Sequence, residues 1–212
     1  MNSFRVAVLA SGTGTNLQAI LDQLHGRPVA EGGPMLEVVG VGSDKPEARA
    51  LARAADAGLP GAVFAAGECP DREARDAALG DWLEELEVAL VVLAGYMQLL
   101  TPGLVRRFAN RIVNVHPALL PSFPGLDAIG QALEHGVWIT GVTVHFVDDG
   151  VDSGPIVLQR PVPIAPDRDR AALEEAIHAT EHELLPEAVR LIAAGRVAIE
   201  PGSRVVRISP GP

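Results

Sequence analysis

The stretch FRVAVLASGTGTNLQAILDQLHG, residues 4–26, decides the fold class. It opens with an almost continuous apolar run of strand length, as expected for a strand that is covered on both faces. A glycine-rich turn follows, and apolar residues then recur every three or four positions, which is typical of a helix ending at Gly26. The stretch therefore predicts a buried strand, a tight turn and a helix in succession.

The same alternation continues through the first half of the chain, where helix-like segments separate further strand-like runs. These runs lie at 36–42, 61–66, 88–94 and 111–116. Strands that alternate with helices imply a parallel sheet with right-handed crossovers. We therefore expect an α/β fold with a mostly parallel twisted sheet, helices on both faces and a Rossmann-like N-terminal half.

The second half of the chain has a different pattern. Two strand-like runs, 138–148 and 155–164, follow each other across a short loop, and a long helical pattern covers about 168–194. Pro161 and Pro163 predict that the second of these strands is a sheet edge for part of its length, because the proline nitrogen has no hydrogen to donate to a neighbouring strand. We expect one domain over 1–212, with a nucleotide-binding-like half of about 1–110 and a second half of about 111–212.

Composition excludes several classes of protein. The chain has 212 residues, of which 48% are hydrophobic, and a single cysteine, so a disulfide framework and a cysteine zinc cluster are excluded. The net charge of −10 argues against general nucleic-acid binding. No signal peptide or membrane-spanning run is apparent, so we expect a cytoplasmic protein with no membrane partner.

Four unusual segments follow the predicted strands at their carboxyl ends, where open parallel sheets bind ligands. They are ASGTGTN (10–16), AGYMQLL (94–100), NVHPALLPSFPG (114–125) and DDGVDSG (148–154). Because the segments are far apart in sequence, their convergence on one rim would be stronger evidence for a site than any single motif.

The segment ASGTGTN opens a helix and predicts an anion site, because backbone amides at a helix N-terminus attract negative charge. It is not a dinucleotide fingerprint, since Leu17 stands where the third glycine is needed, and no Gly-Lys-Ser/Thr makes it a P-loop. A monophosphate is the expected ligand. The alternative is an ordinary glycine-rich turn before a helix.

Asn114 and His116 stand two residues apart at a strand end, so both side chains point to the same side. An amide donor and a proton carrier together are suited to a carbonyl oxygen that becomes an oxyanion. Asp152, in the tight loop GVDSGP, is placed to pair with His116 and favour the imidazolium. The alternatives are a buried structural histidine and aspartates that only form turns.

For two further residues the sequence allows more than one interpretation. His145 lies among apolar residues of a predicted strand, which indicates a core residue or a neighbour of the site. Glu181 lies beside the apolar stripe of the last helix, where an inward carboxylate could bind sugar hydroxyls; a surface glutamate fits the pattern equally well. No pair of histidines has metal-ligand spacing with an acid, so no metal is expected.

With these motifs together, the chain resembles the phosphoribosylglycinamide formyltransferase family over nearly its whole length. The resemblance is carried by SGTGTNLQAI, VVLAGYM, NVHPALLPSFPG and GVTVHFVDDGVDSGPIVLQ, of which the last two are the most specific. It implies the formyltransferase fold. It also implies transfer of a formyl group from 10-formyltetrahydrofolate to the amine of glycinamide ribonucleotide in purine biosynthesis, by direct attack through an oxyanion intermediate.

The resemblance also implies roles for individual residues. Asn114, His116 and Asp152 are the catalytic trio, and Asn114 also meets the folate. The phosphate of the substrate lies on Gly14, Thr15 and Asn16, and its ribose lies near Glu181. The remaining folate-binding positions are Arg72, Met97, Gln98, Leu99 and Leu100. The partners are then two small molecules, with no nucleic acid, and the chain is a monomer or a homodimer.

Three positions depart from the family pattern. Gln98 stands where a basic residue is usual, Asp127 where histidine is usual, and His178 where lysine or glutamine is usual. The rival enzymes are methionyl-tRNA formyltransferase, which normally has a further barrel domain and a basic surface, and formyltetrahydrofolate hydrolase, which usually has an N-terminal regulatory domain. A non-catalytic nucleotide-binding module is the alternative outside the enzymes.

Overall fold

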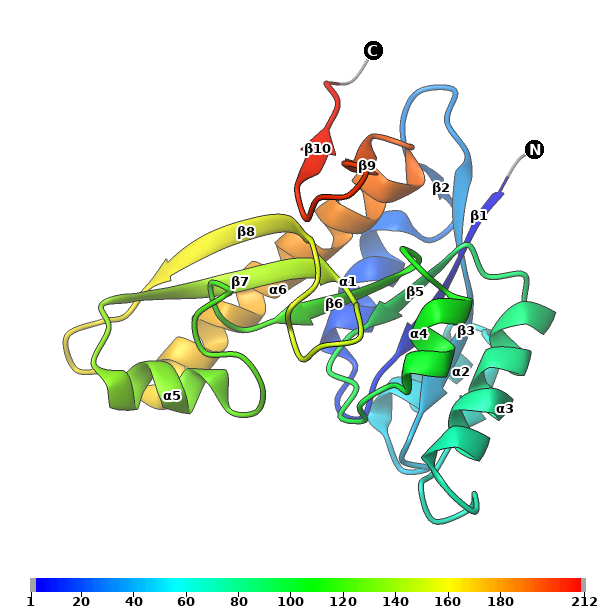
Figure 1. The fold of residues 1–212 in the computed structure, drawn as a ribbon, viewed down its shortest axis with the longest axis horizontal. Coiled ribbons are helices and arrows are strands. Elements are labelled where there is room, and N and C mark those ends of the chain that lie inside the picture. Colours follow the sequence, from blue (N-terminus) through cyan, green and yellow to red (C-terminus); the bar gives the residue numbers. More distant parts are fainter. Residues whose placement is uncertain (1–2, 211–212) are drawn as a thin grey trace. The chain divides into compact units, whose positions relative to one another are not determined.

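A computed structural model of the chain describes residues 3–210. The chain divides into two compact units, of which the first ends at Val113 and the second begins at Asn114. Each unit is described by itself below (Figure 1). Among residues 3–210, no helix combines the length and the apolar character that crossing a membrane requires.

The first unit alternates strands and helices as the sequence predicts. Its elements in chain order are β1 (Ser3–Leu9), α1 (Thr15–Leu24), β2 (Arg27–Pro28), β3 (Met35–Ser43), α2 (Arg49–Asp56), β4 (Gly61–Val63), α3 (Arg72–Glu85), β5 (Leu90–Leu93) and α4 (Pro102–Arg107). The strands neighbour each other in the order β2-β3-β1-β5, and β4 also pairs with β3. β1 pairs in parallel with both β3 and β5, which are its neighbours in the sheet.

Burial explains why these runs form the centre of the unit. The side chains of residues 6–9 on β1 and those of residues 90–93 on β5 are buried, so neither strand has a solvent-facing side over these residues. Continuous apolar runs suit parallel strands that helices cover. β2 is the exception, because its two residues pair with β3 in antiparallel fashion.

The second unit follows from β6 (Ile112–His116), which begins in the first unit and ends in the second. Its other elements are α5 (Ala128–His135), β7 (Ile139–Phe146), β8 (Ile156–Pro163), α6 (Arg170–Ala193), β9 (Val197–Ile199) and β10 (Val206–Ile208). The strands lie in the order β6-β7-β8, with β7 and β8 antiparallel. The long helix α6 runs along β7 and β8, and β9 and β10 form a separate hairpin (Figure 1).

The structure confirms the predicted fold class and adds elements that the sequence did not reveal. The parallel strands, the edge position of β8 and the long last helix are all present. β2, β9, β10 and α4 were not predicted. The prediction that residues 1–212 act as a single domain is not tested by the division into units, and it stays a prediction.

The turn after β6 is anchored by one buried hydroxyl. Thr143 Oγ1 on β7 donates to the carbonyl of Ala118 at 2.6 Å and accepts from the amide of Leu120 at 3.1 Å. Gln159 on β8 donates to the carbonyl of Leu120 at 2.9 Å. The peptide bond between Leu120 and Pro121 is cis.

Substituting Thr143 with valine is expected to destabilise the protein by about 2–4 kcal/mol, because the buried groups of Ala118 and Leu120 lose their partner. Urea unfolding measures this loss. Thr140→Val is the matched control on the same strand: Thr140 is equally buried, but its hydroxyl has no hydrogen-bond partner among the described residues. Equal losses from both variants would contradict the anchoring role.

Candidate active site

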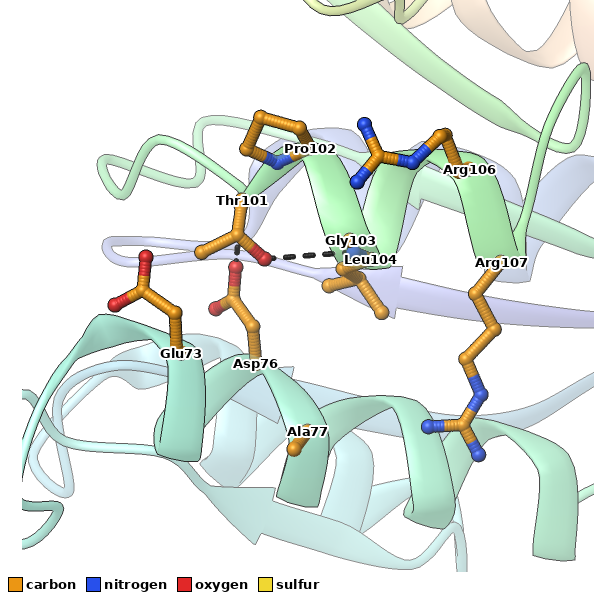
Figure 2. A pocket seen from close by; sticks show the side chains of 9 residues that line it. All are labelled: Glu73, Asp76, Ala77, Thr101, Pro102, Gly103, Leu104, Arg106 and Arg107. Carbon is orange, nitrogen blue, oxygen red and sulfur yellow. Dashed lines mark hydrogen bonds between the residues drawn. The ribbon is translucent and has the colours of Figure 1, made fainter.

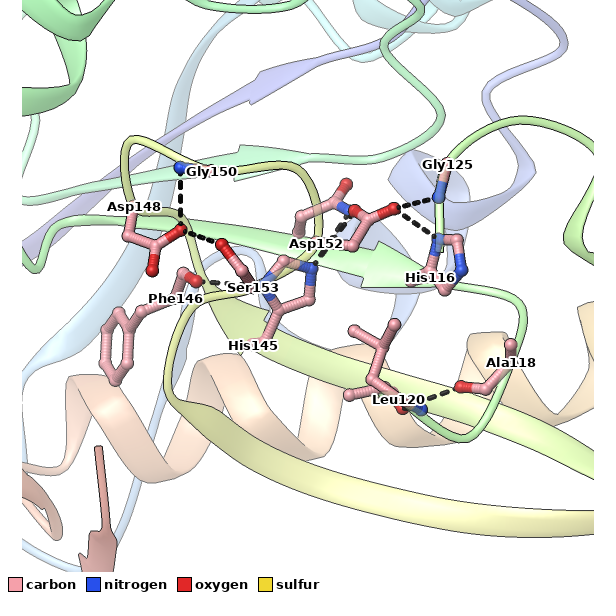
Figure 3. Close-up of polar contacts among 12 residues, drawn as sticks. His116, Ala118, Leu120, Gly125, His145, Phe146, Asp148, Gly150, Asp152 and Ser153 are labelled. Carbon is pink, nitrogen blue, oxygen red and sulfur yellow. Dashed lines mark hydrogen bonds and ion pairs between the residues drawn. The ribbon is translucent and has the colours of Figure 1, made fainter. Parts of the chain in front are cut away.

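Strand β6 carries the first two residues of the candidate site, Asn114 and His116. Asn114 and His116 are two residues apart on β6, so their side chains lie on one side of the strand. The His116 ring is buried, and its Nδ1 lies 3.3 Å from Asp152 Oδ2 (Figure 3). Its Nε2 lies 2.8 Å from the carbonyl oxygen of Phe123. Both ring nitrogens thus face acceptors, an arrangement that the doubly protonated imidazolium satisfies.

The loop between β7 and β8 brings Asp152 to the same place. Asp152 adopts a left-handed backbone conformation with φ 49°, and its Oδ2 accepts the amide of Gly125 at 2.7 Å. Its Oδ1 lies 3.4 Å from Asn114 Nδ2. The three residues that the sequence singled out, 36 and 38 positions apart, therefore meet in the second unit.

The base of this loop is stabilised by a second aspartate. Asp148 Oδ1 accepts the hydroxyl of Ser153 at 2.6 Å and the amide of Gly150 at 3.1 Å (Figure 3). Asp148 Oδ2 accepts from Arg204 at 2.9 Å. Burial alone would raise the pKa of Asp148, but these contacts outweigh it and lower the pKa. Asp148 is thus the turn former that the sequence allowed for among the aspartates.

The environment keeps Asp152 ionised. Burial alone would raise the pKa of its carboxyl. The contacts with His145 and Gly125 and the charge of His116 outweigh burial, so the pKa lies below its usual value. A lowered pKa in the folded state means that the Asp152 carboxylate adds stability above the unfolded-state pKa, and that this is lost as the pH falls through the folded-state pKa.

The stability difference between the wild type and Asp152→Asn should therefore shrink on acidification. We expect the full difference at pH 7, where the carboxylate is ionised in both states, and a decline below about pH 4, the ordinary value for an unfolded aspartate. Urea unfolding at pH 7, 5, 4 and 3 measures it. A difference that is constant over this range would show that the charge of Asp152 does not stabilise the fold.

His145 is a residue whose importance the sequence left open. Its ring is buried on β7, and Nδ1 donates to the carbonyl of Phe146 at 2.8 Å. Nε2 lies 3.3 Å from Asn114 Nδ2 and 3.6 Å from Asp152 Oδ1. It accepts from Asn114 when it carries no proton and donates to Asp152 when it does. The signal in the sequence was its place just before the loop that carries Asp152.

The predicted anion site lies at the start of α1 in the first unit. Gly14 has φ +70°, and a Cβ there would lie 2.8 Å from Cα of Ala50, so only glycine suits the position. Thr15 begins the helix and Asn16 is buried behind it. Arg53 from α2 donates to the carbonyl of Thr13 at 2.9 Å and so fixes the turn.

A direct contact joins this turn to the predicted folate segment. The amide of Met97 donates to Ser11 Oγ at 2.7 Å, and the amide of Ser11 donates to the carbonyl of Gly95 at 3.0 Å. Two of the four predicted segments therefore meet in the first unit, and the other two meet in the second.

Within residues 3–210, no group of three or more His, Cys, Asp or Glu side chains is placed to hold a metal.

The remaining predicted residues have varied surroundings. Arg72 is the exposed first residue of α3, and Glu181 is buried on α6. Met97 and Leu99 are exposed, whereas Gln98 and Leu100 are half-buried.

The three departures from the family pattern each have a defined structural setting. The side chain of Gln98 lies between Arg75 and Asp44. Asp127 caps α5 through the amide of Gly130 and pairs with Arg170. His178 is exposed, and its ring stacks against the ring of His182 with 6.5 Å between the two ring centroids.

Comparison with known proteins agrees with this geometry. Residues 4–189 match the family model described as formyl transferase. The chain is 41% identical over 196 residues to phosphoribosylglycinamide formyltransferase of Haemophilus influenzae, covering 92% of this chain and 90% of that protein. It is 46% identical over 197 residues to the trifunctional purine biosynthetic protein adenosine-3 of Drosophila melanogaster, covering 93% of this chain but only 14% of that much longer protein.

Solved structures show the same relationship. Glycinamide ribonucleotide transformylase 1 from Symbiobacterium toebii superposes with a TM-score of 0.90 at 48% identity, covering 98% of this chain and 95% of that one. Phosphoribosylglycinamide formyltransferase from Bacillus halodurans superposes with a TM-score of 0.82 at 40% identity, covering 89% and 94%. The match in sequence and fold, over almost all of the described residues, places the chain in the formyl transferase family.

Proposed function

We propose that this chain transfers a formyl group from 10-formyltetrahydrofolate to the primary amine of glycinamide ribonucleotide. The observation that carries the proposal is the ion pair of His116 and Asp152 beside Asn114, in a chain that covers nine-tenths of relatives named for this reaction. We infer that these three residues are the catalytic groups.

The reaction needs stabilisation of one developing negative charge. The substrate amine attacks the formyl carbon, and the carbonyl oxygen becomes an oxyanion in a tetrahedral intermediate. His116 and Asn114 then supply N–H donors to that oxygen, where the charge develops. Asp152, held by the amide of Gly125, orients the His116 ring and supports transfer of a proton from the attacking amine to the folate nitrogen, which leaves as its bond to the formyl carbon breaks.

The geometry leaves these donors available to a substrate. The contacts of Asn114 Nδ2 with His145 Nε2 and Asp152 Oδ1 are long, at 3.3 and 3.4 Å. Turning an N–H of Asn114 toward a substrate oxygen therefore costs little hydrogen-bond energy. His116 Nε2 donates to the carbonyl of Phe123, and a reacting oxygen must share or replace that acceptor. Hydrogen bonds of catalytic groups often tighten only when the substrate is bound.

The substrates are assigned on the resemblance together with the local structure. We propose that the phosphate lies on Gly14, Thr15 and Asn16, because the N-terminus of α1 presents backbone amides to an anion. The ribose is assigned to Glu181. The folate is assigned to Arg72, Met97, Gln98, Leu99, Leu100 and Asn114.

A spectroscopic transfer assay tests the proposal. The wild type and His116→Ala are each mixed with 10-formyltetrahydrofolate and one of three acceptors: glycinamide ribonucleotide, methionyl-tRNA or water alone. We expect transfer only to glycinamide ribonucleotide, and a loss of about 10²–10³-fold in rate for His116→Ala. Transfer to methionyl-tRNA or to water, an inactive wild type, or a fully active variant would overturn the assignment.

A further inference from the structure

Helix α3 carries two adjacent charged residues in the interior of the first unit. Arg75 is 2% exposed and Asp76 is 1% exposed. Arg75 Nη2 lies 2.7 Å from Asp76 Oδ1, and Arg75 Nε donates to the same oxygen at 2.9 Å. A buried ion pair is weak evidence for stability, because well-packed apolar side chains often serve as well. The contacts that this pair makes elsewhere therefore indicate its role.

The other contacts of the pair all reach one short segment, residues 98–101. Arg75 Nη1 donates to Gln98 Oε1 at 2.7 Å, and Arg75 Nη2 donates to the carbonyl of Leu99 at 3.1 Å. Asp76 Oδ2 accepts the amide of Thr101 at 2.5 Å (Figure 2). Each of the two charges is thus used to hold the backbone of this segment, and a fork of N–H donors fixes direction as well as position.

A second carboxylate, that of Asp44 just after β3, completes the network. The amide nitrogen of Gln98 donates to Asp44 Oδ2 at 2.9 Å, so the Gln98 side chain is held at both ends of its amide. The neighbouring residue Met97 is held through its backbone amide by Ser11. Residues 97–101 are therefore fixed from the inner side at four positions, 97, 98, 99 and 101.

The outer side of the same segment is apolar and open. Met97 is 58% exposed and Leu99 is 60% exposed, and they flank the half-buried Gln98. Large apolar side chains on a rigid backbone are a typical lining for the flat face of a ligand. The segment thus has an inner side that fixes its shape and an outer side suited to an aromatic ring system.

We propose that Arg75, with Asp76, is a positioning residue for formylfolate binding. The pair fixes residues 98–101 so that Met97 and Leu99 are already arranged for the folate before it binds. This inference rests on the proposed function, which supplies the identity of the ligand. A prearranged segment lowers the ordering cost of association, so loss of the pair weakens folate binding rather than slowing the chemical step.

The test uses the double variant Arg75→Met/Asp76→Leu, because either single apolar substitution leaves a buried charge unpaired. We expect KM for 10-formyltetrahydrofolate to rise by roughly tenfold or more, as the loss of a charge-assisted hydrogen bond implies. KM for glycinamide ribonucleotide and kcat should stay within about twofold, which distinguishes positioning from general damage. Arg107→Met is the matched control, since Arg107 also pairs with α3, through Asp81 and Glu84 on the surface, and should leave every parameter unchanged.

Two measurements do not depend on turnover. Calorimetric titration with 10-formylfolate gives the affinity directly, and hydrogen exchange at the amide of Thr101 reports whether the segment has loosened. We expect weaker binding and faster exchange in the double variant. If that variant does not fold, Arg75→Lys replaces it, because lysine keeps the charge but loses the fork that spans Gln98 and Leu99.

The outcomes separate the two proposals. A wild type that binds 10-formylfolate without transferring a formyl group overturns the proposed function alone. A wild type that binds no folate overturns both. Unchanged folate affinity in the double variant or in Arg75→Lys, or an equal loss in all kinetic parameters, overturns the positioning role of Arg75.

Discussion

Replacing Asp152 with asparagine is expected to reduce the turnover of formyl transfer by roughly 10²–10⁴-fold, the range typical of a lost acid–base group. The reason is geometric as well as electrostatic. Both carboxylate oxygens of Asp152 are acceptors, one for Gly125 and His116 and the other toward Asn114. An asparagine must turn an NH₂ group toward one of these donors, so at least one contact becomes repulsive.

The measurement is kcat at saturating substrates, with circular dichroism to establish that the variant is folded. Asp167→Asn is the control, since it removes the same charge from an exposed loop of the same unit. A turnover within tenfold of the wild type for Asp152→Asn would show that the carboxylate only forms the turn, which is the alternative that the sequence left open.

Replacing Gly154 with alanine is expected to reduce turnover by at least about 100-fold without touching a reacting group. A Cβ at position 154 would overlap the carbonyl oxygen of Phe146, which is backbone and cannot move aside as a side chain can. The loop must therefore shift, and it carries Asp152 with it. A displacement of about 1 Å in a catalytic group is enough for a loss of this size.

The assay for Gly154→Ala is again kcat, together with thermal unfolding. Gly67→Ala is the control, because a Cβ at that glycine has open space around it. If Gly154→Ala kept its activity while Asp152→Asn lost it, the loop would tolerate displacement, and the close packing at its base would have no part in placing the carboxylate.

The sequence predicted the fold where the pattern was long and periodic. β1 and β5 contain continuous buried apolar runs, and α6 has a stripe that recurs over 24 residues. The sequence did not predict the short elements, because they have no periodic pattern of apolar residues. β2 has two residues, β9 and β10 have three each, and α4 has six, and none of them lies in an apolar run as long as 61–66 or 88–94, the runs that predicted β4 and β5.

The site was predictable to the extent that it consists of polar side chains at strand ends. Asn114, His116 and Asp152 have that signature, and they do meet. The carbonyl of Phe123 and the amide of Gly125 hold His116 and Asp152, but backbone groups leave no mark in a sequence. Arg75 and Asp76 were missed for another reason: a charged pair on a helix normally marks the solvent-facing side, and here it is buried.

The edge strand β8 has a consequence for how copies of this chain can associate. The amide of Ile164 donates toward β7, so by strand alternation positions 161 and 163 direct their nitrogens outward, and both are proline. The outer rim of β8 therefore offers no N–H at either position to an incoming strand, and neighbouring chains cannot extend the sheet there. Over residues 161–163 of this rim a second copy therefore finds no backbone donor, and a contact between copies there has to rely on other groups.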